Sequence, residues 1–169
     1  MNLYRICASA TMIFSFTSCS ASMNLGEAVV SMSGGKPCFA VPSDPSTKGG
    51  ITLYEISVTA HALRASRAER LQWKMEITPP GASVQVFPGN CISYGSIPVG
   101  GIEPVRKPLE LYTVYAVAVD ARPGNSNMRA YLALFCMKPD STGRLAVFTM
   151  SRSQNQGEGR FDICQKPSN

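Results

Sequence analysis

Histidine is nearly absent from this 169-residue chain, which contains only His61. A serine or cysteine nucleophile with a histidine base would therefore have to be built around that one residue. His61 continues the alternation of a predicted strand, where an exposed or partly packed imidazole is the ordinary expectation. The 11 acidic residues form no short paired-carboxylate motif. The sequence therefore predicts no catalytic residue and no enzyme activity.

Long apolar segments are also missing. A transmembrane helix needs about 20 apolar residues, whereas the candidate segments here are only positions 6–16 and 111–119. Positions 6–16 follow Arg5 and precede a run of small residues, an order that is typical of an export signal. We therefore predict that positions 1–18 form a signal peptide and that no later segment crosses a membrane as a helix.

The predicted export signal leads into the sequence "FTSC", in which the cysteine is Cys19. Small residues directly before a cysteine are typical of a lipoprotein signal, although Phe16 stands in place of the usual leucine. Ser20, rather than an aspartate, follows the cysteine, and in bacterial lipoproteins this favours the outer membrane. We predict a periplasmic protein that is anchored to the outer membrane by a lipidated Cys19. Cleavage after Ala21, which would discard Cys19, is the alternative.

Closely spaced cysteines are lacking in the rest of the chain. Cys38, Cys91, Cys136 and Cys164 are separated by 53, 45 and 28 residues, which fits neither a zinc knuckle nor a thioredoxin-type motif. We therefore expect no metal and no cofactor. Four cysteines in an exported chain predict two disulfides, with three pairings open. We favour Cys38–Cys164, which would join the first and last strands, together with Cys91–Cys136.

Strand periodicity fills most of the chain. It is clearest in "LQWKMEI", where Leu71, Trp73, Met75 and Ile77 alternate with polar residues. The segment 109–120 is more continuously apolar, which predicts a central strand that is covered on both faces. The other predicted strands span 36–42, 53–60, 83–87, 128–136, 144–150 and 160–164, with turns at 121–127 and 138–143.

Many short strands in one exported chain predict an all-β fold, an antiparallel β-sandwich of the immunoglobulin-like kind. A small barrel is the alternative. Only the segment 61–71 favours a helix, and it is either one short surface helix or the polar tip of a long hairpin. We expect a lipidated tether at 19–33 and a single sandwich domain at 34–169.

The net charge of +5 includes a cluster formed by Arg64, Arg67 and Arg70. This cluster is either a solvated loop or a contact for an acidic protein surface. Arg122 and Arg129 bracket a second candidate contact, a hairpin tip. Nucleic acid is a poor fit, because the aromatic residues follow strand patterns and do not lie among the basic residues.

Four segments carry a resemblance to a known family: "GKPCFAVP", "FPGNCISYG", "LELYTVYAVAVDA" and "YLALFC". Their order, within Lys36–Cys136, resembles that of the periplasmic lipoproteins described as type VI secretion system immunity proteins. Cys164 lies outside the region of likeness. The resemblance implies that the chain binds and neutralises a cognate secreted effector toxin by non-catalytic protein–protein interaction. It implies membrane contact through the lipid anchor alone and no small-molecule substrate.

Two other classes of function remain open from the sequence. A structural or assembly lipoprotein of the cell envelope or secretion apparatus would have a similar sandwich, with constitutive envelope partners. An enzyme acting on envelope material would need a polar cleft around His61 or around a pair of acidic residues.

Overall fold

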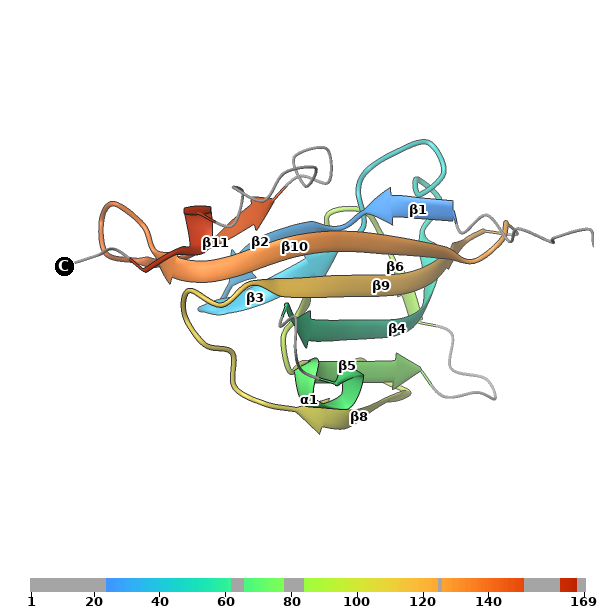
Figure 1. Cartoon of the computed structure of the whole chain (residues 1–169). Coiled ribbons are helices and arrows are strands. Elements are labelled where there is room, and N and C mark those ends of the chain that lie inside the picture. Colours follow the sequence, from blue (N-terminus) through green and yellow to red (C-terminus); the bar gives the residue numbers. More distant parts are fainter. Residues whose placement is uncertain (1–23, 62–65, 78–83, 125, 151–161, 167–169) are drawn as a thin grey trace, which may run out of the picture.

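Two β-sheets form the fold in the computed structural model, which describes residues 24–61, 66–77, 84–124, 126–150 and 162–166 (Figure 1). The large sheet runs in the order β1 (Asn24–Glu27), β10 (Arg129–Pro139), β9 (Tyr115–Pro123), β4 (Ile51–Ala60), β5 (Leu71–Ile77) and β8 (Gly101–Arg106). Beside this path, β11 (Leu145–Met150) pairs with β10 and β6 (Val84–Val86) with β4. The small sheet contains β2 (Val29–Ser33), β3 (Lys36–Ala40) and β7 (Ile92–Ser93).

The small sheet covers one face of the large sheet, and β2 and β3 pass behind β9 and β10 in Figure 1. Phe39 of β3 contacts both Trp73 of β5 and Phe135 of β10, with ring centroids 5.9 and 5.6 Å apart. All three side chains are buried in one continuous core. The predicted all-β sandwich is therefore confirmed. The described pairings are antiparallel except for β1 with β10, which is parallel.

Alternation along the central strands separates the core from an outer face. In β9, Tyr115, Val117 and Val119 are buried in the core, while Ala116 and Ala118 point the other way. The neighbouring strand β4 follows the same rule except at a bulge near Tyr54, where its register against β9 shifts. The extra residue leaves two successive half-buried positions and then restores the alternation.

The predicted strand at 109–120 begins six residues too early and ends three residues before β9 does. In the structure β9 begins at Tyr115, and Tyr112 adopts a left-handed backbone with φ of 61°. That conformation cannot continue a strand. The amide of Glu110 is instead bonded to the Tyr115 hydroxyl, which accepts it at 2.7 Å. The apolar character of residues 109–114 therefore led to a predicted start that is too early.

Several short strands were missed. β1 and β2 lie inside the predicted tether 19–33, so ordered pairing already begins at Asn24 and not at position 34. β8 contains Pro104, which argues against a central strand but is tolerated at an edge, and β8 is an edge of the large sheet. β7 has only two residues.

The predicted last strand, 160–164, is wrong where it is described. Asp162–Cys164 forms a short 3₁₀ helix, η2, and positions 160 and 161 lie outside the described residues. A disulfide to β10 fixes this segment, with no strand ladder. Cys136 and Cys164 form a small second cluster with Met150, separate from the main core.

The predicted helix is present but short. Its described part, α1 (Arg67–Arg70), lies beside β5 in Figure 1. Ser66 caps it, because its hydroxyl accepts from the Glu69 amide at 3.3 Å while the Glu69 carboxylate accepts from the Ser66 amide at 2.7 Å. This reciprocal pair of hydrogen bonds is a capping box. It fixes the start of α1, and β5 follows α1 directly.

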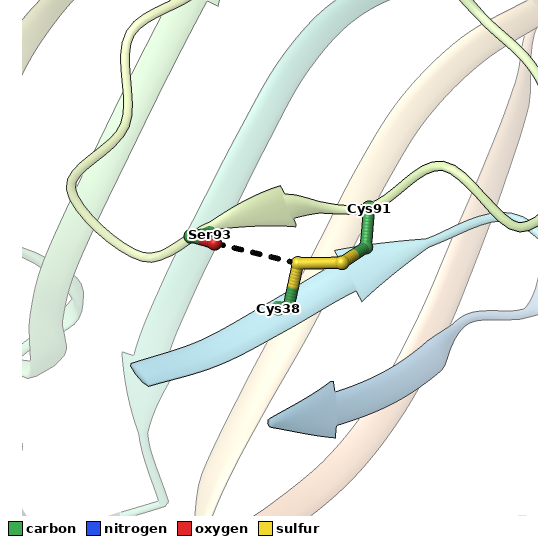
Figure 2. The surroundings of a disulfide bond; sticks show 3 residues. All are labelled: Cys38, Cys91 and Ser93. Atoms are coloured by element: carbon green, nitrogen blue, oxygen red, sulfur yellow. Dashed lines mark hydrogen bonds between the residues drawn. A yellow bond between two sulfur atoms is a disulfide. The ribbon is translucent and has the colours of Figure 1, made fainter. Parts of the chain in front are cut away.

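Two disulfides are present as predicted, but the favoured pairing is wrong. Cys38 of β3 bonds to Cys91, with Cα atoms 5.4 Å apart, and Cys136 bonds to Cys164, with Cα atoms 5.9 Å apart. The reason is strand adjacency: β3 pairs with β7, which brings Cys91 beside Cys38 (Figure 2). The hydroxyl of Ser93, directly opposite Cys38, lies 3.5 Å from its sulfur.

The disulfides give a testable order of stability. Replacing both Cys38 and Cys91 by Ala should lower the free energy of unfolding by about 2–4 kcal/mol. Replacing Cys136 and Cys164 should cost about 0.5 kcal/mol less, because that bridge closes a span of 28 residues and not of 53. Urea unfolding of the two variants measures the difference. Non-reducing peptide mapping provides the control, and a peptide linking Cys38 to Cys164 would contradict the pairing.

Candidate binding surfaces

The arginines predicted to contact a partner do not form one surface. Leu71 pairs with Thr59 near the end of β4, and the next residue of β4, Ala60, pairs with Tyr115. Arg70, which precedes Leu71, therefore lies at this end of the large sheet. Arg122 and Arg129 lie at the opposite end, beside the start of β4. Arg64 lies outside the described residues, and only the backbone of Arg67 is described, in α1.

Arg122 and Arg129 pack against tyrosines of their own sheet. The Arg122 guanidinium lies 5.4 Å from the ring centroid of Tyr54, and that of Arg129 lies 5.8 Å from the ring of Tyr131. Arg129 also donates to the Ser46 hydroxyl at 3.1 Å. Contacts of this kind contribute about 0.5–1 kcal/mol at exposed sites. Tyr131 is in the core whereas Tyr54 is not, so the two arginines lie on opposite faces of the sheet near the hairpin tip.

Arg70 lines a cavity of about 460 Å³ on the outer face of the large sheet. The floor of this cavity is made of small side chains, among them Ser57, Ala116 and Ala118, which point away from the core. Leu132 and Leu134 line it as well. The buried Nε of Arg70 has no hydrogen-bond acceptor within the part of the chain that the structure describes.

The outer face also carries a charge cluster around Lys74. Its ammonium lies 3.3 Å from a Glu55 carboxylate oxygen and also pairs with Glu76, which raises the Lys74 pKa. Burial raises the pKa of nearby Asp120, and the Lys74 charge opposes that rise. Ionised Asp120 is therefore unfavourable for the folded state.

This shift predicts a pH-dependent effect on stability. The pKa of Asp120 is near 3.8 in the unfolded chain and higher in the folded protein. The contribution of Asp120 to the free energy of unfolding therefore falls as the pH rises through these two pKa values. Asp120→Asn should raise the Tm at pH 7 by about 1–3 °C and lose this advantage near pH 3.

Asp140→Asn is the matched control for Asp120→Asn. Hydrogen bonds from Thr142 hold the Asp140 pKa below its usual value, so its contribution is present at neutral pH and lost as pH falls. This variant should therefore lower the Tm at pH 7. Thermal unfolding of the wild type and both variants at pH 3 and pH 7 measures these changes in Tm. A Tm for Asp120→Asn below that of the wild type at pH 7 would contradict the raised pKa of Asp120.

A second recess, of about 510 Å³, is basic. We call it the basic groove. It is lined by basic residues (Lys36, Arg106, Lys107), by Gly35 and Tyr94, and by apolar residues (Pro37, Pro108, Leu109, Leu111, Met137, Leu145). No acidic side chain is in this lining. The sequence analysis missed the groove, because its cations lie in the separate short runs "GGKP" and "RKP".

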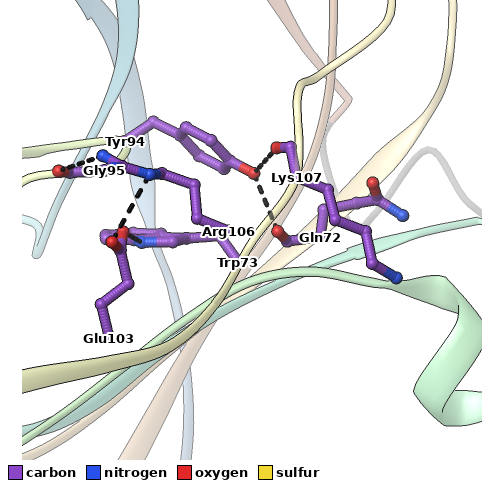
Figure 3. Close-up of polar contacts among 7 residues, drawn as sticks. All are labelled: Gln72, Trp73, Tyr94, Gly95, Glu103, Arg106 and Lys107. Atoms are coloured by element: carbon purple, nitrogen blue, oxygen red, sulfur yellow. Dashed lines mark hydrogen bonds and ion pairs between the residues drawn. The ribbon is translucent and has the colours of Figure 1, made fainter.

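Tyr94 fixes the wall of the basic groove. Its hydroxyl donates toward the carbonyl oxygens of Lys107, at 2.6 Å, and Gln72, at 3.0 Å (Figure 3). The Lys107 amide donates to the same Gln72 carbonyl at 2.7 Å. Burial raises the Tyr94 pKa, so the phenol remains a donor at physiological pH. The segment after β8 is thereby tied to β5.

Glu103 orients Arg106 at the rim of the groove. One Glu103 oxygen accepts from the Trp73 indole nitrogen at 2.6 Å, and the other lies 3.4 Å from Arg106 Nε (Figure 3). Arg106 Nη1 donates to the Gly95 carbonyl at 3.2 Å. The Glu103 side chain is only 10% exposed, whereas that of Arg106 is 55% exposed. The guanidinium is therefore held in place yet accessible.

His61 does not lie in either recess. It is exposed just after β4, and its amide donates to the Val114 carbonyl at 2.8 Å. Within the described ranges, no three His, Cys, Asp or Glu residues are grouped so that they could hold a metal ion. The helices of the same part of the chain are too short and too polar to cross a bilayer.

Comparison of this chain with protein-family models, with curated proteins and with solved structures gives no match.

The Glu103 contacts lead to a stability prediction. Glu103→Ala should lower the free energy of unfolding by about 1–3 kcal/mol, because it leaves the indole N–H of fully buried Trp73 without an acceptor. Glu103→Gln is the matched control. It keeps an acceptor for the indole and loses the ion pair with the half-exposed Arg106, so it should cost less than Glu103→Ala. Urea unfolding followed by fluorescence of Trp73, the only tryptophan, measures both. Equal losses in the two variants would contradict the role of the indole bond.

Proposed function

We propose that this protein is a periplasmic immunity lipoprotein, which binds a cognate type VI secretion effector and neutralises it by non-catalytic protein–protein interaction. The observation that carries the proposal is the pair of disulfides, Cys38–Cys91 and Cys136–Cys164. Disulfides persist in oxidising compartments such as the periplasm, where such a protein would have to act.

The spatial arrangement of the resembling segments adds support. Segment 35–42 and segment 87–95, far apart in the sequence, are joined by the Cys38–Cys91 bond and by β3–β7 pairing. Segments 109–121 and 131–136 pair as β9 and β10. The four segments on which the family resemblance depends therefore lie as two neighbouring pairs, one pair in each sheet.

The membrane anchor belongs to the same proposal. Cys19 and the predicted signal 1–18 lie outside the described residues, and the first described strand begins at Asn24. Five residues reach at most about 18 Å. A lipid on Cys19 would therefore hold the β1 side of the large sheet within a short distance of the outer-membrane surface.

Protection against a toxin tests the function. Deleting the gene should make the producing strain sensitive to the effector encoded beside it, and restoring the wild-type gene should return resistance. The mature proteins, mixed in solution, should form a complex that persists through size-exclusion chromatography. Unimpaired growth of the deletion strain together with the lack of any complex would refute the proposal.

Two control variants sharpen this test. His61→Ala should protect as well as the wild type, since binding and not catalysis is responsible. Cys19→Ser should lose lipid labelling and move from the membrane to the soluble fraction, while the purified variant still binds the effector. Loss of protection in His61→Ala, with an intact fold, would instead favour an enzyme.

A further inference from the structure

We propose that the basic groove receives an acidic segment of a protein partner, in which carboxylate side chains flank an apolar residue. The inference rests on the proposed function only for the identity of that partner, the effector. Its basis is the composition, the charge and the preformed shape of the groove.

The charge of the groove selects for a negative partner. Its cations come from two elements, Lys36 at the start of β3 and Arg106 with Lys107 at the end of β8. Glu103 offsets part of this charge, but it already accepts from the Trp73 indole and faces Arg106. The Glu69 carbonyl accepts from the Lys107 ammonium at 3.3 Å, and the capping hydrogen bonds and the charge of Lys107 lower the pKa of the Glu69 carboxyl. The lining itself thus presents three cations and no carboxylate, and the two neighbouring carboxylates, Glu103 and Glu69, offset only part of that charge.

The apolar part of the lining selects for a protein over a phosphate or a polynucleotide. Leu111 and Leu145 are 46% and 41% exposed, and Pro108 is exposed beside them in the lining. Removing these three side chains from water favours binding of an apolar side chain. Nucleic-acid grooves combine cations with exposed aromatic faces, whereas the one aromatic ring in this lining, that of Tyr94, is buried.

The groove is also preformed, which lowers the entropy lost on binding. Backbone bonds join its walls: the Tyr94 amide donates to Pro37 at 2.8 Å, and the Tyr112 amide donates to Met137 at 2.9 Å. Tyr112, next to Leu111, holds the left-handed backbone that is rare for a bulky residue. Backbone outliers of this kind are concentrated at ligand-binding sites. The volume, about 510 Å³, suits a few side chains and not a whole domain face.

A defined peptide tests the groove without the effector. The probe is the fluorescein-labelled peptide Gly-Asp-Leu-Asp-Phe-Glu-Gly, and two controls replace its acids by Lys or its Leu and Phe by Ser. We expect saturable binding of the probe below about 1 mM, weaker binding of both controls, and amide NMR shifts confined to the groove. Binding should weaken as salt is added. No binding, equal binding of the Lys peptide, or shifts elsewhere would overturn the proposal.

Charge reversal supplies the matched variants. Lys36→Glu with Lys107→Glu should weaken binding of the probe roughly tenfold or more. Lys48→Glu with Lys166→Glu makes the same change in net charge at exposed positions outside the lining and should leave the affinity unchanged. Thermal unfolding of both variants verifies that they fold. Equal effects of the two pairs would overturn the assignment to the groove.

Other ligand classes and the effector complete the design. Binding of phosphatidylglycerol vesicles or of a single-stranded oligonucleotide at the groove, without binding of the peptide, would overturn the proposal. If the peptide binds but no effector complex forms, the groove is upheld and the immunity function fails. If the effector complex forms and tolerates Lys36→Glu with Lys107→Glu, the function is upheld and the groove fails.

Discussion

The contact of Phe39 with Trp73 and Phe135 is the interaction on which the two-layer structure depends. Phe39 is the large buried side chain through which the three-stranded sheet reaches rings of both β5 and β10. The neighbouring residue, Cys38, is bonded to Cys91, so packing and covalent linkage act on successive residues of β3. Together they fix where Tyr94 enters the core, and Tyr94 in turn fixes the wall of the basic groove.

Periodicity predicted the strands with one buried face, because apolar and polar residues alternate within the strand itself. Trp73 and Met75 of β5 are examples. Pairing between distant segments was not predictable, since nothing in the sequence around Cys38 shows that β3 lies beside β7. The hairpin tip between Arg122 and Arg129 is local in the sequence and was predicted. The basic groove joins distant segments and was therefore missed. Lys36 and Lys107 become neighbours in one lining only through the fold.

The two recesses differ in what they present. The cavity beside Arg70 lies over alanine and serine side chains of the outer sheet face. The basic groove lies at the junction of the small sheet with the segment that follows β8, where exposed leucines and cations are held on a hydrogen-bonded frame. Rigid placement of exposed cations and apolar side chains is what protein recognition requires, and it comes from the same contacts that stabilise the sandwich.

The parallel pairing of β1 with β10 has a consequence for the order of folding. Asn24 is opposite Arg129 and Glu27 is opposite Leu132, so β1 has no partner strand until more than a hundred further residues have been synthesised. Chains emerge from their N-terminus, and contacts of such long sequence separation form slowly. The strand that follows the predicted anchor therefore docks late, and it shares one edge of β10 with β11, which completes the other half of that edge.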